Sequence, residues 1–305
     1  MKAVQALLAM ALCVGLIALT GCGEASEPGD EDTASAAQGL DGLDVTQETT
    51  TTRDQRDISY RVVGSGDQDV VLIHGWMVSG NVYDNLIDEL ASDDLRLIIP
   101  DLRGTGDSDK PNGGYALQTY LHDVDAVLDD ADADDYVLAG HSMGGALAQR
   151  HAAQNPGDAA ALVLMSPVPA SGFPLPEEDY QFFKSAADDA ETKRIILAIS
   201  SVDMDPDDIE HLAQGADEIP AKAIEQSLDA WVFADFADMI HKIEAPTKVL
   251  VSDDPFMNVD FLQAFVADLI SDATVSYFPG GGHYLQVEEP AQTATAIADF
   301  IDSLD

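Results

Sequence analysis

Short apolar runs alternate with helix-like repeats of apolar residues from Ile58 to the end of the chain. The runs are typical of buried strands, and apolar residues spaced three and four apart are typical of amphipathic helices. The predicted strands are Ile58–Val63, Val70–Ile73, Leu95–Ile99, Tyr136–Ala139, Ala161–Met165, Lys248–Val251 and Thr274–Phe278. The predicted helices are Val82–Leu90, Leu117–Leu128, Ser142–Gln154, Val259–Ile270 and Ala291–Leu304. This alternation predicts a mostly parallel twisted sheet with helices on both faces.

The alternation stops between residues 168 and 240, where the sequence is helical and rich in aromatic residues. An interruption of this kind predicts a helical insertion that caps one edge of the sheet. The aromatic residues of the insertion are Phe173, Tyr180, Phe182, Phe183, Trp231, Phe233 and Phe236. We expect most of them to form the core of the cap and some to line a pocket.

The first residues form a separate segment. Ala3–Leu19 is apolar except for Gln5 and Gly15, and Lys2 precedes it. This run predicts a secretory signal, although it approaches the length of a membrane-spanning anchor. Leu19-Thr20-Gly21-Cys22 resembles a bacterial lipoprotein cleavage site. We therefore expect a signal peptide over residues 1–21 and a lipid on Cys22, which would anchor an exported domain to a bacterial membrane, facing the periplasm or the exterior.

Residues 22–57 are rich in small and acidic side chains and lack periodicity. Such a composition cannot bury a core, so we expect a flexible acidic tether ahead of a domain over residues 58–305. The chain has 14 Lys and Arg against 56 Asp and Glu, a formal net charge of −42. A polyanion repels phosphate backbones, which argues against nucleic acid as a partner. We interpret the charge as a solvated surface adapted to a salty exterior.

Cysteine chemistry and nucleotide hydrolysis are not expected of the domain. Both cysteines, Cys13 and Cys22, precede it, so it has no thiol for a disulfide or a metal site. The acidic runs 129–135 and 203–210 lack the glycine and the closing glutamate of a calcium loop, and no phosphate-binding loop is present. We expect no metal and no cofactor.

The strongest motif is Gly140-His141-Ser142-Met143-Gly144, which follows a predicted strand and opens a predicted helix. This context predicts a nucleophile elbow, with Ser142 on a strained turn and the Met143 amide directed at a developing oxyanion. His74-Gly75-Trp76 follows an earlier strand, so the Trp76 amide is the candidate second donor and its indole a candidate pocket wall.

A serine nucleophile needs a base and a group that orients the base. His283 follows three glycines just after the last predicted strand, and we select it as the base from the seven histidines. The acid is expected after Lys248–Val251, where Asp253 and Asp254 are adjacent. We favour Asp254 because Pro255 follows it, with Asp253 as the alternative.

These motifs resemble the α/β-hydrolase superfamily over residues 58–305, and in particular its esterase, perhydrolase and cofactor-free haloperoxidase branch. Further support comes from Asp101-Leu102-Arg103-Gly104-Thr105-Gly106-Asp107-Ser108 and from Gly282-His283 followed by Glu288-Glu289-Pro290. The chain departs from the family because Val251-Ser252 leads straight into the two aspartates, without the usual glycine.

The resemblance implies a serine hydrolase that cleaves carboxylic esters or lactones through an acyl-enzyme. In that case, aromatic residues of the cap would line an acyl pocket. Two alternatives remain open. One is a perhydrolase or cofactor-free haloperoxidase that uses the same triad, and the other is a non-catalytic ligand receptor on this fold.

Overall fold

The computed structural model describes residues 43–92 and 94–304. The predicted signal peptide, Cys22 and most of the predicted tether lie outside the described residues. Within them, no helix combines the length and the apolar character needed to cross a membrane.

The described residues form an eight-stranded sheet in the order β1-β2-β4-β3-β5-β6-β7-β8. β1 is antiparallel to β2 and β2 to β4, whereas the other neighbours are parallel. The strands are β1 Val45–Thr51, β2 Asp57–Val63, β3 Gln68–Ile73, β4 Leu95–Pro100, β5 Tyr136–His141, β6 Ala159–Met165, β7 Thr247–Val251 and β8 Ala273–Tyr277. Every residue of β5 is buried, as is all of β3 after its first residue. This explains their uninterrupted apolar sequence, because both faces of these strands are covered.

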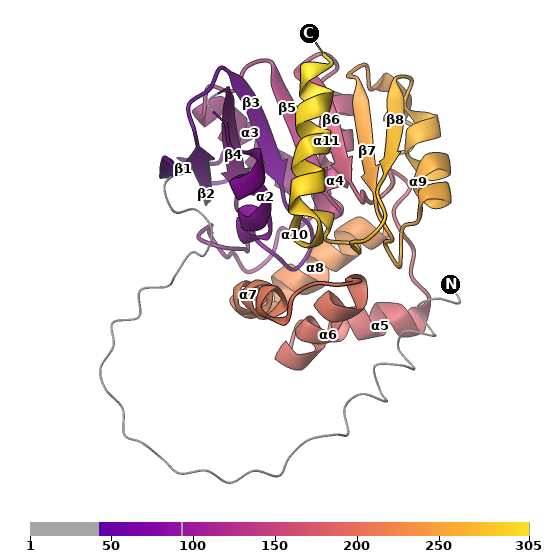
Figure 1. The fold of residues 1–305 in the computed structure, drawn as a ribbon. Helices are drawn as coiled ribbons and strands as arrows, with labels where there is room; N and C mark the ends of the chain where they lie inside the picture. Colours follow the sequence, from indigo (N-terminus) through magenta and orange to yellow (C-terminus); the bar gives the residue numbers. More distant parts are fainter. Residues whose placement is uncertain (1–42, 93, 305) are drawn as a thin grey trace, which may run out of the picture.

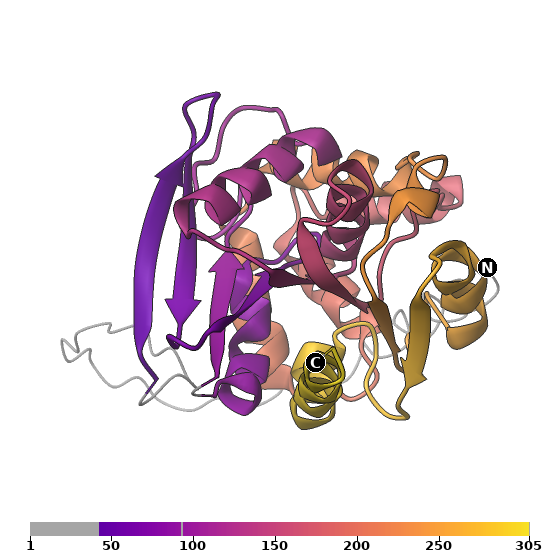
Figure 2. The same ribbon diagram turned by 90° about the horizontal axis from the view of Figure 1, so that it is seen from above.

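Helices cover both faces of the sheet, as Figure 2 shows, with α2 and α11 on one face and α3 and α4 on the other. The helices outside the cap are α2 Asp84–Leu90, α3 Leu117–Asp130, α4 Met143–Gln154, α9 Val259–Phe265, α10 Leu285–Glu288 and α11 Pro290–Asp302, with 3₁₀ turns η1 Gly80–Tyr83, η2 Ile240–Lys242 and η3 Ala267–Leu269. The predicted helix Val259–Ile270 is divided at Val266, whose φ of −128° is not helical. The predicted mostly parallel, doubly covered sheet is confirmed.

The predicted helical insertion consists of α5 Glu177–Ser185, α6 Ala190–Ser200, α7 Pro206–Asp217 and α8 Ala221–Val232, which lie together at one end of the sheet (Figure 1). Local sequence sets where these helices begin. The Asp189 side chain accepts hydrogen bonds from the backbone amides of Glu191 and Thr192, and Pro206 opens α7 after the capping Asp205. Both are standard helix N-terminal arrangements.

The prediction that the tether extends to residue 57 is wrong. Val45–Thr51 forms β1, which pairs with β2 from Val45 opposite Val63 to Thr51 opposite Asp57. The strand is almost entirely exposed, so its polar, threonine-rich sequence has no apolar alternation to reveal it. Backbone pairing and the preference of threonine for extended structure hold it in place.

The segment after β1 is also fixed to the domain. Asp54 makes a bidentate ion pair with Arg103, with nitrogen–oxygen distances of 2.9 and 3.1 Å. Arg103 is 2% exposed and also contacts Asp123, which is fully buried. A buried guanidinium needs such partners because an unpaired buried charge is costly, and Asp54 supplies one of them.

Candidate active site

Ser142 lies on the turn between β5 and α4, with φ +54° and ψ −115°. Positive φ is strained for a residue with a side chain. A Cβ added at Gly144 would lie 2.1 Å from the Ile73 carbonyl oxygen, and one at Gly140 would lie 2.3 Å from the Gly144 carbonyl oxygen. The two glycines therefore allow the helix to start directly against the sheet, which is the geometry of a nucleophile elbow.

His283 and Asp254 are hydrogen-bonded to each other through Nδ1 and Oδ2, 2.7 Å apart. Asp254 follows β7 and His283 follows β8, so the parallel strands bring both to the same end of the sheet as Ser142. The other oxygen of Asp254 accepts the backbone amides of Phe256 at 2.7 Å and Met257 at 3.0 Å.

Asp254 is favoured as a carboxylate by its partners. Burial of the side chain opposes ionisation, but His283 and the amides of Phe256 and Met257 stabilise the charge and lower the pKa of Asp254. An ionised Asp254 accepts the Nδ1 proton of His283, which leaves Nε2 free to act as a base.

The adjacent Asp253 has a different role. Its carboxylate accepts hydrogen bonds from the Tyr277 hydroxyl at 2.7 Å and from the Gly280 amide at 3.1 Å. Asp253 thereby supports the loop of residues 280–282 from its exposed side, whereas Asp254 is the carboxylate that binds His283.

Ser142 and His283 line one cavity of about 40 Å³ under the cap. Its other lining side chains are mainly aromatic or aliphatic, and no Lys, Arg, Asp or Glu is among them: Trp76, His141, Phe173, Leu175, Phe183, Ile196, Ser200, Trp231, Phe256, Met257 and Tyr284. The predicted wall residue Trp76 is therefore part of the pocket. Of the seven cap aromatics, Phe173, Phe183 and Trp231 line it, whereas Phe233 is 63% exposed.

The loop after β3 lies against the elbow. A Cβ at Gly75 would be 3.1 Å from the Ser142 Cβ and 2.9 Å from the His141 Nδ1. Trp76 follows this contact, and Met143 is the first residue of α4, where backbone amides have no intrahelical acceptor. The predicted oxyanion donors thus flank the serine. The Trp76 indole donates to the Ile224 carbonyl of α8 at 3.0 Å, which ties this loop to the cap.

His74, the histidine of the same loop, is a structural residue. Its Nδ1–H donates to the Gly75 carbonyl at 2.8 Å, and its Nε2 accepts the Leu102 amide at 3.0 Å. These bonds join the loops after β3 and β4, so both ring nitrogens are occupied away from Ser142.

Several contacts around the site are not visible in the sequence motifs. The Ser200 carbonyl at the end of α6 accepts the His283 amide at 2.8 Å. The Glu288 carboxylate accepts the amides of Val202 and Asp203 at 2.8 and 2.9 Å. The cap is therefore attached directly to the loop that carries His283. Glu288 belongs to a recognisable motif, but its partners are remote in sequence and follow no pattern.

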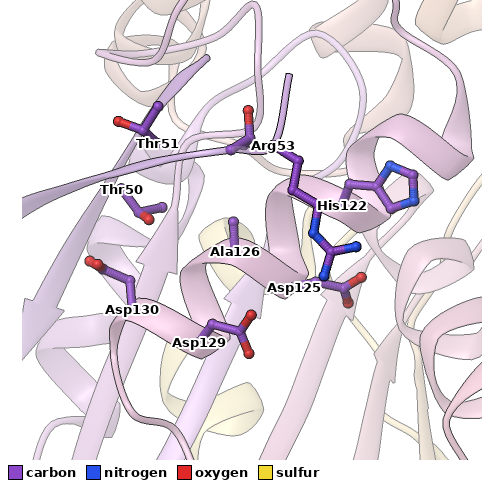
Figure 3. Close-up of a pocket in the computed structure, with 9 residues that line it drawn as sticks. Thr50, Thr51, Arg53, His122, Asp125, Ala126, Asp129 and Asp130 are labelled. Carbon is purple, nitrogen blue, oxygen red and sulfur yellow. The ribbon is translucent and has the colours of Figure 1, made fainter. Parts of the chain in front are cut away.

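A larger hollow of about 340 Å³ lies over α3 and the end of β1, where Arg53 extends toward Asp125 (Figure 3). Its lining contains threonines, aspartates and His122 but no serine or cysteine, and it shares no residue with the Ser142 pocket. The described part of the chain also contains no group of His, Cys, Asp and Glu placed to hold a metal ion.

Comparison with known proteins agrees with the observed fold. The model of the alpha/beta hydrolase family matches residues 70–296. The chain is 28% identical over 258 residues to the non-heme chloroperoxidase CPO-A1 of Kitasatospora aureofaciens, covering 76% of this chain and 90% of that protein. It is 40% identical over 123 residues to a non-heme chloroperoxidase of Streptomyces lividans. That match covers 40% of this chain and only 45% of the chloroperoxidase. An esterase structure from Exiguobacterium antarcticum superposes with a TM-score of 0.77 at 22% identity, covering 83% of this chain and 98% of the esterase.

Proposed function

Because the chain belongs to the alpha/beta hydrolase family, we propose that it is a serine hydrolase that cleaves small carboxylic esters or lactones. The observation that carries this proposal is the 2.7 Å hydrogen bond between His283 and Asp254 beside an elbow serine with φ +54°. A nucleophile, a base and an orienting acid then converge at one pocket.

In the proposed reaction, His283 Nε2 removes the Ser142 proton as Oγ attacks the ester carbonyl. Asp254 holds the Nδ1 proton and stabilises the imidazolium that forms. The amides of Trp76 and Met143 donate to the oxyanion, and each such donor is worth on the order of 100-fold in rate. The imidazolium protonates the leaving alcohol, and a water activated by His283 then releases the acid from Ser142.

The pocket restricts the substrate. The cavity is small, about 40 Å³, which favours a short acyl group over a long one. The lining has no charged side chain apart from the proposed catalytic groups, so a charged acyl group would lose its hydration without gaining a partner. Short, uncharged acyl groups are the proposed substrates.

The test is hydrolysis of p-nitrophenyl acetate, butyrate and octanoate by the wild type and by Ser142→Ala. We expect the wild type to prefer acetate and the variant to lose at least about a thousandfold in kcat. Ser303→Ala is the matched control, because Ser303 is exposed on the end of α11 and should leave the rate unchanged. Wild-type protein without esterase activity would refute the proposal, and activity in Ser142→Ala would refute the role of the serine.

Perhydrolysis is the second candidate, and the similarity to two non-heme chloroperoxidases favours it. Hydrogen peroxide would replace water in attacking the acyl-enzyme, so that the bond to Ser142 breaks and a peracid leaves, which then oxidises halide. Peroxide- and acetate-dependent bromination by the wild type, absent in Ser142→Ala, is the expected result. No bromination above the Ser142→Ala background would exclude this activity.

We also propose that the protein is exported and held at a bacterial membrane through a lipid on Cys22, in accordance with its N-terminal sequence.

A further inference from the structure

The loop that carries His283 has few side chains of its own to hold it. Three glycines precede His283, and Gly280 and Gly281 have φ of +100° and +29°. Glycine backbones are conformationally permissive, so contacts from neighbouring elements must set the position of the base. Ser252 donates to the Gly282 carbonyl at 2.6 Å, and the Ser200 carbonyl accepts the His283 amide.

Asp253 accepts the Gly280 amide, and Asp254 binds the His283 side chain. A further contact comes from His141, the residue directly before Ser142. Its Nε2 lies 2.9 Å from the carbonyl oxygen of His283. A carbonyl only accepts, so Nε2 carries the proton and Nδ1 is a bare lone pair. His141 is 1% exposed, and its ring lies 4.8 Å from that of His283 and 5.1 Å from that of Tyr284, centroid to centroid.

We propose that His141 is a positioning residue that fixes the distance between the nucleophile and its base, through the hydrogen bond from its Nε2–H to the His283 backbone carbonyl. This inference rests on the proposed function. His141 adjoins Ser142 in the chain and binds the backbone of His283 directly, so one short path joins the two reacting groups. The contacts from Ser252, Ser200, Asp253 and Asp254 join the loop to elements other than the turn that carries Ser142.

The surroundings of His141 keep its ring neutral, with the proton on Nε2. Its Nδ1 is buried and has no hydrogen-bond partner in the described part of the chain. Burial and the neighbouring His283 hold the pKa of His141 well below its usual range. The ring therefore stays neutral, donates from Nε2, and places no positive charge beside the base. Gly75 leaves the space for this ring, because a Cβ there would lie 2.9 Å from Nδ1.

The test compares His141→Phe, which keeps a ring but has no donor, with His141→Gln, which keeps an amide donor near the position of Nε2. We expect His141→Phe to lower kcat for p-nitrophenyl acetate about 100-fold, because small displacements of a base are costly, with KM nearly unchanged. His141→Gln should regain about tenfold of that loss, the value of one hydrogen bond. His122→Phe and His122→Gln are the matched controls, since His122 is exposed on α3, and both should stay within about twofold of the wild type.

A second measurement separates this inference from the proposed function. The rate at which a fluorophosphonate labels Ser142 depends on activation of the serine but not on ester turnover. Slow labelling of His141→Phe and faster labelling of His141→Gln would support positioning even in a protein that hydrolyses no ester. Labelling and turnover of His141→Phe at wild-type rates would overturn it while leaving a serine esterase intact. Equal losses in His141→Phe and His141→Gln would overturn it as well, because the donor would then be irrelevant.

Discussion

Replacement of Asp254 by asparagine should abolish most of the activity without disturbing the fold. The side chain is almost the same size, and its single oxygen can still accept the amides of Phe256 and Met257. The other position becomes an NH₂ group that faces His283 Nδ1. A donor at that position favours the tautomer in which Nδ1 is bare and Nε2 carries the proton. His283 can then no longer take the proton of Ser142.

The structure also shows why the new amide should not rotate to restore the original arrangement. Rotation would direct the NH₂ group at the amides of Phe256 and Met257, leaving two buried donors without an acceptor. Each unsatisfied donor costs about 1–3 kcal/mol, so the unproductive orientation is preferred by about 2–6 kcal/mol. The wrong tautomer is thereby fixed, and we expect kcat to fall on the order of 10⁴-fold.

The assay is kcat and KM for p-nitrophenyl acetate, with a thermal melt to check folding. Asp253→Asn is the matched control, because Asp253 binds Tyr277 and Gly280 on the exposed side of the loop. It should retain activity within about threefold of the wild type, as expected for a surface substitution. A folded Asp254→Asn protein with more than about a tenth of wild-type activity would refute the tautomer argument. So would an Asp253→Asn protein with the larger loss.

Four further results are expected. Asp54→Asn should lower the free energy of unfolding at neutral pH by about 1 kcal/mol at most, because Asp54 is half exposed. The Arg103 hydrogen bond lowers the pKa of Asp54, so the difference between the urea curves of the two proteins should persist above about pH 4 and shrink progressively as pH falls from that value through the lowered pKa; a difference that grows in acid would contradict this sign. Gly75→Ala should slow ester hydrolysis about tenfold or more, since the added Cβ meets His141 Nδ1 at 2.9 Å, and unchanged kinetics would count against the close approach of this loop. The urea midpoint should rise from low to molar potassium chloride because salt screens the net charge of −42, and a constant midpoint would disprove the salt interpretation. Cys22→Ser should abolish incorporation of labelled palmitate in a bacterial host and release the protein from the membrane fraction, whereas equal labelling of both proteins would exclude Cys22 as the lipidated residue.

The parts of the fold that the sequence predicts well are those whose burial follows a simple period. Strands β3 and β5 are covered on both faces and therefore appear as unbroken apolar runs. The elbow was predictable because its turn requires glycines at fixed positions beside Ser142. β1 was missed because it is an exposed edge strand whose stability comes from backbone pairing, which leaves no hydrophobic pattern.

The site was predictable where chemistry dictates residue type, and not where it depends on tertiary contact. The choice between Asp253 and Asp254 could not be derived from their adjacent positions, since it depends on which carboxylate faces His283. The attachment of the cap through Ser200 and the hydrogen bond from His141 involve backbone carbonyls. Every residue has a backbone carbonyl, so no residue type marks these contacts.

The hairpin of β1 and β2 determines where an expressed fragment of this protein should begin. A fragment that starts at residue 58 would remove β1 and expose the backbone donors and acceptors of β2 that now pair with it. Open sheet edges of this kind recruit strands from other molecules and promote aggregation. The same fragment would also lack Asp54. Of the two carboxylates that now pair with Arg103, it would keep only Asp123. A fragment that starts at Leu43 keeps both features, so we expect it to remain soluble where the shorter one precipitates.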